Sequence, residues 1–110
     1  MAGFVKGQVV VVPFPFSDLT QAKRCPALVI AGLEGIDLIL CQITSRAVLD
    51  KYAIPINDSD FEGKGLRQAS NIRPNRIFTA DSRIVLYQIG SLKTEKFARI
   101  IDKVIEIIRE

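Results

Sequence analysis

The sequence predicts a mainly β protein with one helix at its C-terminal end. Short runs rich in Val and Ile are separated by segments rich in Gly, Pro and Asp, which is typical of short strands joined by turns. The last part of the chain instead repeats its apolar residues at helical spacing. About six short strands and one helix in 110 residues fit a single domain, residues 1–110, built as a small, strongly bent sheet or barrel.

Two buried strands are predicted in the first third of the chain. Residues 9–12 are four consecutive valines, which disfavour a helix and suit a strand buried on both faces, and Pro13 and Pro15 follow them. Residues 17–23 are polar and predict a loop. Residues 26–31 predict the second strand, because Pro26 fixes its own φ and favours an extended conformation for the residue before it.

The middle of the chain predicts a hairpin followed by an edge strand. The turn falls at residues 32–35, and the strand of residues 36–44 alternates its side chains between two faces. Residues 52–56 predict an edge strand, because Pro55 cannot donate a hydrogen bond to a neighbouring strand. Residues 57–65 contain several Asp and Gly and predict turns.

The final third predicts further strands and then the helix. Residues 66–78 predict a pair of strands interrupted by Pro74, and residues 84–89 predict a short strand closed by Gly90. The helix is expected at residues 94–109 with Thr94 as its N-cap. Its apolar stripe, expected to cover the sheet, consists of Phe97, Ile100, Ile101, Val104, Ile105 and Ile108.

Composition excludes several kinds of chemistry and leaves others open. The chain has no histidine, so it has no Ser–His or Cys–His pair, and it has no glycine-rich phosphate loop. Cys25 and Cys41 are the only cysteines, and we expect reduced thiols in a cytoplasmic protein without a structural metal. No segment is long and apolar enough to suggest a membrane span. The net charge of +3 permits an anionic partner without requiring one.

A set of arginines and hydroxyl groups lies at the predicted strand ends. Such groups can bind a phosphodiester and stabilise the charge that develops when it is cleaved. The alternative interpretation is a scatter of surface arginines beside a threonine that merely ends a strand. The residues concerned are Arg24, Thr44, Ser45, Arg73 and Arg76.

Three segments, in order along the chain, resemble the MazF/PemK family of toxin endoribonucleases. They are residues 7–16 (GQVVVVPFPF), residues 23–29 (KRCPALV) and residues 41–45 (CQITS). Residues 70–79, which contain an arginine, and residues 90–92, before the helix, are also similar to the family pattern. No single motif is decisive, but the ordered series covers nearly the whole chain.

The resemblance implies a fold, an activity and partners. The implied fold is an SH3-like small barrel of the MazF/PemK/CcdB type with a C-terminal helix, assembled as a homodimer. The implied activity is cleavage of single-stranded RNA by attack of the ribose 2′-hydroxyl, without a metal or other cofactor. The implied partner is a cognate antitoxin whose disordered tail occupies the RNA groove, and no membrane is involved.

The resemblance also carries site residues onto this chain. The hydroxyl at the end of the family's third strand falls on Thr44, and the arginine of its later strand falls on Arg73, so these two are the predicted catalytic residues. Family members often have aspartate two positions further on, where this chain has an asparagine. The predicted RNA-binding residues are Lys23, Arg24, Ser45, Asn75 and Arg76.

One departure from the family pattern bears on activity. The family usually has arginine directly before the strand-opening proline, where this chain has Cys25. Arg24 lies one residue earlier, and neighbouring side chains of a strand point to opposite faces. The alternative hypothesis is therefore a catalytically weak or inactive member that acts by binding a protein, as the topoisomerase inhibitor CcdB does. Whether Arg24 or Cys25 substitutes for the family arginine stays open.

Overall fold

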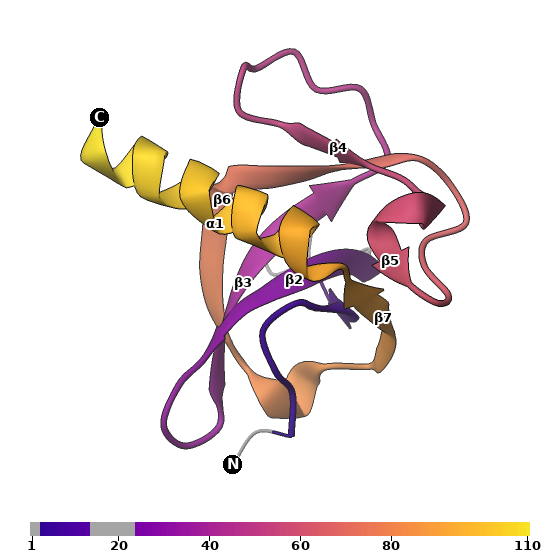
Figure 1. Cartoon of the computed structure of the whole chain (residues 1–110). Helices are drawn as coiled ribbons and strands as arrows, with labels where there is room; N and C mark the ends of the chain where they lie inside the picture. The colour runs from indigo at the N-terminus through magenta and orange to yellow at the C-terminus, as the bar shows by residue number, and fades with distance from the viewer. Residues whose placement is uncertain (1–2, 14–23) are drawn as a thin grey trace, which may run out of the picture.

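The computed structural model describes residues 3–13 and 24–110, and its strands form one curled antiparallel sheet with a helix across it (Figure 1). The order of neighbours in the sheet is β4-β6-β3-β2-β1-β7-β5. The predicted mainly β fold with a C-terminal helix is confirmed. The strands are β1 (Gln8–Pro13), β2 (Arg24–Gly32), β3 (Asp37–Thr44), β4 (Ile54–Ile56), β5 (Phe61–Glu62), β6 (Ser70–Asp81) and β7 (Tyr87–Leu92), and the helix is α1 (Thr94–Arg109).

The central strands bury side chains on both faces, as the valine run in β1 predicts. Alternate residues fill two separate apolar clusters, so neighbours such as Val9 and Val10 belong to different ones. The first cluster includes Val9, Leu28, Cys41, Ile43, Ile54, Ile72 and Ile100. The second includes Val10, Val12, Ala27, Val29, Leu38, Leu40 and Ala80.

Helix α1 covers the first cluster. Fewer of its apolar residues pack against the sheet than the apolar stripe predicted from the sequence contains. Ile100 and Val104 are buried and Phe97 packs against the cluster, whereas Ile105 and Ile108 are exposed. The prediction of Thr94 as N-cap is wrong by one residue. The cap is Lys93, whose side chain makes no capping hydrogen bond, and Thr94 is the first helical residue.

The prediction of a strand pair interrupted by Pro74 is wrong, because a single long strand, β6, runs from Ser70 to Asp81. Leu38 to Cys41 pair with Ala80 to Ile77, but the next residue, Gln42, pairs with Arg73. Three residues of β6 therefore bulge out of the ladder. Pro74 lies in this bulge, where its missing N–H costs no ladder hydrogen bond.

Two smaller differences concern the turns around β5 and β7. The segment predicted as turns contains a short 3₁₀ helix, Asp58–Asp60, and then β5, which pairs with β7 at the sheet edge. The last strand starts at Tyr87, later than predicted, because residues 82–84 form another 3₁₀ turn. Gly90 does not close this strand but lies inside it, where an added Cβ would collide with the carbonyl oxygen of Lys64.

Within the described residues, no helix is both long and apolar enough to cross a membrane.

Candidate active site

The sheet register brings the two predicted catalytic residues onto one face of neighbouring strands. Gln42 pairs with Arg73 across β3 and β6, and Thr44 pairs with Asn71. Paired residues of antiparallel strands share a face, and so do residues two apart along a strand. Thr44 therefore lies on the same face as Arg73, at the end of β3. The bulge begins immediately after Arg73, so this side chain lies where the sheet ladder is interrupted.

Arg73 is held by a carboxylate that lies outside the sheet. Its Nη2 donates to Oδ2 of Asp50 at 2.8 Å, and the two side chains are 19% and 26% exposed. Asp50 belongs to the loop between β3 and β4. The same oxygen of Asp50 also accepts a long hydrogen bond of 3.4 Å from Nδ2 of Asn75. A loop carboxylate thus links the predicted catalytic arginine and a predicted RNA-binding asparagine.

The carboxylate of Asp50 is itself fixed by the backbone. Its Oδ1 accepts hydrogen bonds from the N–H groups of Tyr52 and Ala53, each at 3.0 Å. The hydrogen bond from Arg73 lowers the pKa of Asp50, and these two backbone bonds lower it further. Asp50 therefore stays ionised at neutral pH.

Thr44 is bonded to the turn that follows it. Its Oγ1 accepts from the backbone N–H of Arg46 at 3.2 Å, and the carbonyl oxygen of Arg46 accepts from Nδ2 of Asn71 at 3.3 Å. The hydroxyl hydrogen is not used in the first bond, so it stays available to donate to a ligand. Ser45 lies in the same turn and is exposed.

The backbone of Arg73 is fixed from the opposite face of the sheet. The thiol of Cys41 donates to the carbonyl oxygen of Arg73 at 3.0 Å. Burial raises the pKa of Cys41 to about 12, so it is a neutral thiol at physiological pH. Cys41 therefore serves as a hydrogen-bond donor beneath the site.

Two buried polar atoms of the site have no hydrogen-bond partner in the described part of the chain. They are Nε of Arg73, a donor, and Oε1 of Gln42, an acceptor. They belong to residues that pair directly across the strands. Buried polar groups normally have partners, and native structures leave them unpaired at few places, often functional ones.

The sheet also determines which residue of β2 faces the site. Cys25 pairs with Val12, and Ala27, two residues on, pairs with Gln42, so Cys25 is on the face of Gln42 and Arg73. Arg24 alternates onto the other face and is exposed.

The remaining predicted RNA-binding positions differ in how they relate to this site. Asn75 and Arg76 lie in the bulge and are exposed. Lys23 lies outside the described residues. The structure thus brings together Thr44, Arg73 and Asn75, whereas Arg24 lies on the opposite face.

Asp50 is the residue that sequence analysis missed. The only signal for it is local: an aspartate between two predicted strands, two residues before Tyr52, can accept from the following backbone N–H groups. That pattern predicts a turn and says nothing of a partner far along the chain. Its pairing with Arg73 depends on the path of the loop in three dimensions.

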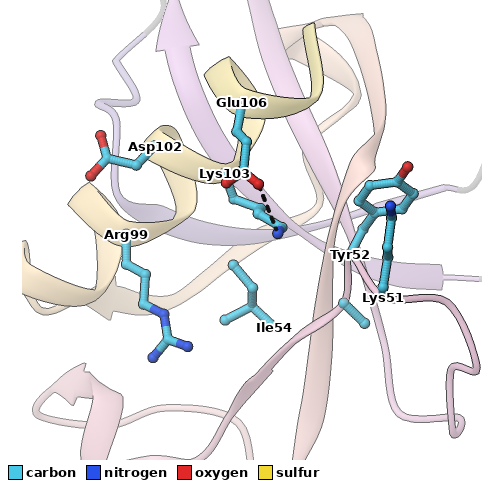
Figure 2. A pocket seen from close by; sticks show the side chains of 8 residues that line it. Lys51, Tyr52, Ile54, Arg99, Asp102, Lys103 and Glu106 are labelled. Atoms are coloured by element: carbon cyan, nitrogen blue, oxygen red, sulfur yellow. Dashed lines mark ion pairs between the residues drawn. The ribbon is translucent and has the colours of Figure 1, made fainter. Parts of the chain in front are cut away.

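A surface pocket of about 300 Å³ lies between α1 and residues 51–54, which directly follow Asp50 in the chain (Figure 2). Lys51, Tyr52 and Ile54 contribute one wall, and α1 contributes the other. Its charges are mixed, and none of the predicted site residues lines it. The residues from α1 are Arg99, Asp102, Lys103 and Glu106.

The described residues contain no group of three or more His, Cys, Asp or Glu side chains positioned to bind a metal ion. What the arrangement offers instead is a fixed guanidinium, a hydroxyl at a strand end and an amide. These groups suit an anionic ligand such as a phosphodiester.

Comparisons with known proteins give consistent results. The sequence matches the model of a family described as PemK-like, MazF-like toxins of type II toxin–antitoxin systems over residues 5–108. No curated protein matches the sequence.

Solved structures share this fold at low sequence identity. MazF from Deinococcus radiodurans has a TM-score of 0.74 at 20% identity, with 97% of each chain covered. The Mycobacterium tuberculosis toxin MazF-mt6 has a TM-score of 0.72 at 15% identity, covering 93% of this chain and 96% of that one. A mycobacterial endoribonuclease in complex with its cognate antitoxin has a TM-score of 0.74 at 11% identity, covering 96% and 95%.

Proposed function

Because this chain belongs to the family of PemK-like, MazF-like toxins of type II toxin–antitoxin systems, we propose that it is an endoribonuclease that cleaves single-stranded RNA without a metal ion. The observation that carries the proposal is the placement of Thr44 and Arg73 on one face of adjacent strands, with Arg73 held by a fixed carboxylate. Two mycobacterial endoribonucleases share the fold, which also supports the proposal.

The proposed reaction is an internal transfer at one phosphodiester. The ribose 2′-oxygen attacks the phosphorus, the bond from phosphorus to the 5′-oxygen breaks, and the products are a 2′,3′-cyclic phosphate and a 5′-hydroxyl. The proton lost by the 2′-hydroxyl is balanced by the proton gained by the leaving oxygen. Arg73 stabilises the charge on the phosphoryl oxygens, because a guanidinium can donate parallel hydrogen bonds to a phosphate. Thr44 orients the 2′-hydroxyl or a phosphate oxygen.

The proposed partners follow from the family. In this proposal the protein is a homodimer in the cytoplasm, and a cognate antitoxin holds its activity off by placing a disordered tail in the RNA groove. A solved complex of a similar endoribonuclease with its antitoxin supports this part of the proposal.

Purified protein incubated with a long single-stranded RNA in EDTA tests the activity. We expect cleavage products with cyclic phosphate and 5′-hydroxyl ends, as judged by end-group analysis. Arg73→Ala should lower the rate on the order of a hundredfold or more, since removing one preorganised donor typically costs that much. Thr44→Ala should also lower it. Arg83→Ala is a matched control, because Arg83 forms a comparable ion pair with Asp81 at 2.7 Å. Intact RNA after incubation with the folded wild type would contradict the proposal.

Cys25→Arg tests the placement of the site on β2. It restores the cation that the family pattern has at this position, on the face shared with Arg73. We expect equal or higher cleavage activity, whereas Arg24→Ala should act mainly on RNA affinity and reduce its salt dependence. A folded Cys25→Arg variant that no longer cuts RNA would show that the site lies elsewhere.

The alternative function is inhibition of a topoisomerase by protein binding, as with CcdB. It is favoured by Cys25 in place of the family arginine and by Asn75 in place of the frequent aspartate. Absence of RNA cleavage together with inhibition of purified gyrase supercoiling would support this alternative.

A further inference from the structure

We propose that Asp50 is a positioning residue for RNA cleavage, which holds the guanidinium of Arg73 in the orientation that grips the phosphate. This inference rests on the proposed endoribonuclease function. It assigns a role to a loop residue that neither the sequence motifs nor the family pattern indicates.

The two oxygens of Asp50 have separate partners, so the carboxylate has one orientation. Oδ1 accepts from the backbone of Tyr52 and Ala53, and Oδ2 accepts from Arg73 and, more weakly, from Asn75. Rotating the carboxylate toward any other group would break all these hydrogen bonds together. Asp50 is thus a rigid support and not a mobile surface acid.

Arg73 keeps enough donors to bind a phosphate while it is held. A guanidinium has five N–H groups in a fixed planar fork, and the bond to Asp50 engages Nη2 alone. The side chain is 19% exposed, and its Nε atom is buried. An arginine free in solution has many rotamers, and fixing one in advance removes the ordering cost from the reaction.

Asp50 places a carboxylate next to the position where family members often have aspartate and this chain has asparagine. Asn75 stands at the position where members often have aspartate, and its amide lies 3.4 Å from Oδ2 of Asp50. Asp50, in the loop between β3 and β4, therefore supplies a negative charge beside Asn75 from a different part of the chain. Arg73 favours the ionised form of Asp50, which makes this carboxylate a weak proton acceptor and favours positioning over proton transfer.

Asp50→Asn is the appropriate variant, because the asparagine oxygen can still accept from the Tyr52 and Ala53 backbone. Its amide would then face Arg73 with donors, so the support is lost while the turn is retained. We expect kcat to fall on the order of tenfold to a hundredfold, as misplacing a catalytic group does, with KM for RNA little changed. Asp81→Asn is the matched control: Asp81 pairs with Arg83 and accepts from its backbone N–H in the same way.

A double-mutant cycle shows whether Asp50 acts through Arg73. In the Arg73→Ala background, measured with enzyme in excess over RNA, Asp50→Asn should cost nothing further. An additional loss in that background would assign Asp50 a direct role in proton transfer and overturn the proposal. A rate above wild type in Asp50→Asn would show that the ion pair between Asp50 and Arg73 inhibits cleavage, which would also overturn the proposal.

A second measurement does not need RNA. The Nε–Hε group of Arg73, observed by ¹⁵N relaxation, should be ordered in the wild type and in Asp81→Asn but mobile in Asp50→Asn. Equal order in all three proteins would overturn the proposal. If the wild type cuts no RNA, the proposed function fails and the role in cleavage fails with it. If the wild type cuts RNA and Asp50→Asn cuts equally fast, only the role of Asp50 fails.

Discussion

Arg73 is fixed from both of its ends, and this explains why one side chain dominates the candidate site. The thiol of Cys41 binds its carbonyl oxygen, Pro74 favours its extended backbone, and Asp50 binds its guanidinium. Sequence analysis predicts Arg73 from the family pattern and its extended backbone from Pro74. It cannot predict Asp50 or Cys41 as partners, since both contacts depend on the register of β3 with β6 and on the path of a loop.

The buried thiol of Cys41 leads to a prediction about reactivity. Its pKa of about 12 means that the thiolate is scarce at pH 8, so iodoacetamide should not modify Cys41 in the folded protein. In a Cys25→Ser variant, which leaves Cys41 as the only thiol, mass spectrometry should find modification only after denaturation. Rapid modification of the native variant would contradict the observed burial.

The same pKa shift gives a sign for the dependence of stability on pH. The folded state holds the Cys41 proton more tightly than the unfolded chain, whose thiol has a pKa near 9. The contribution to stability is therefore complete below pH 9 and declines as pH rises from there towards 12. Cys41→Ala should reduce that alkaline decline in urea unfolding.

Local sequence patterns predict the strands and the helix, but they do not predict the irregularities within these elements. The valines of β1, the alternation in β3 and the helical spacing in α1 predict the elements correctly, because these patterns directly reflect burial. The sequence does not predict the bulge in β6. Pro74 predicts that the strand ends, but pairing with β3 on both sides of Pro74 keeps it one strand. Ile105 and Ile108 are apolar yet exposed. The apolar stripe of the helix therefore does not show by itself which of its residues contact the sheet.

Gly90 provides a prediction about β7. An alanine Cβ at this position would meet the backbone of Lys64, which cannot move aside as a flexible side chain can. We expect Gly90→Ala to lower the free energy of unfolding by about 1–3 kcal/mol, as overpacking typically does. Gly32→Ala is the matched control, because an added Cβ there has only ordinary contacts at 3.6 Å and 4.0 Å. Equal urea midpoints for the two variants would contradict the close approach of Gly90 to Lys64.

The whole molecule is a curled sheet with one cluster under the helix and another on the opposite face. Sequence analysis predicts this architecture, and the family resemblance identifies its type. The four valines of residues 9–12 are buried within the protein, so they offer no apolar surface to a second chain. Apolar side chains that are exposed in the described part of the chain include Ile84, Leu86 and Tyr87, which are close in sequence.

The homodimer remains a prediction at this scale. Because several exposed apolar side chains close together favour association, we expect sedimentation velocity at micromolar concentration to give the mass of two chains. A dilution series should move the protein toward the monomer only at much lower concentration. A monomer at every concentration would contradict this prediction.

The bulge in β6 has a consequence for how this protein can change over evolution. On each side of Pro74–Arg76 the strand pairs with β3 in its own register, so the ladder does not depend on the bulge. Pro74 is buried, but Asn75 and Arg76 are exposed, so these two can be exchanged while the pairing on both sides is preserved. Asn75 and Arg76 lie in this segment beside Arg73. If the proposed RNA-binding role of these two residues holds, RNA preference could change through them while the paired strands stay constant.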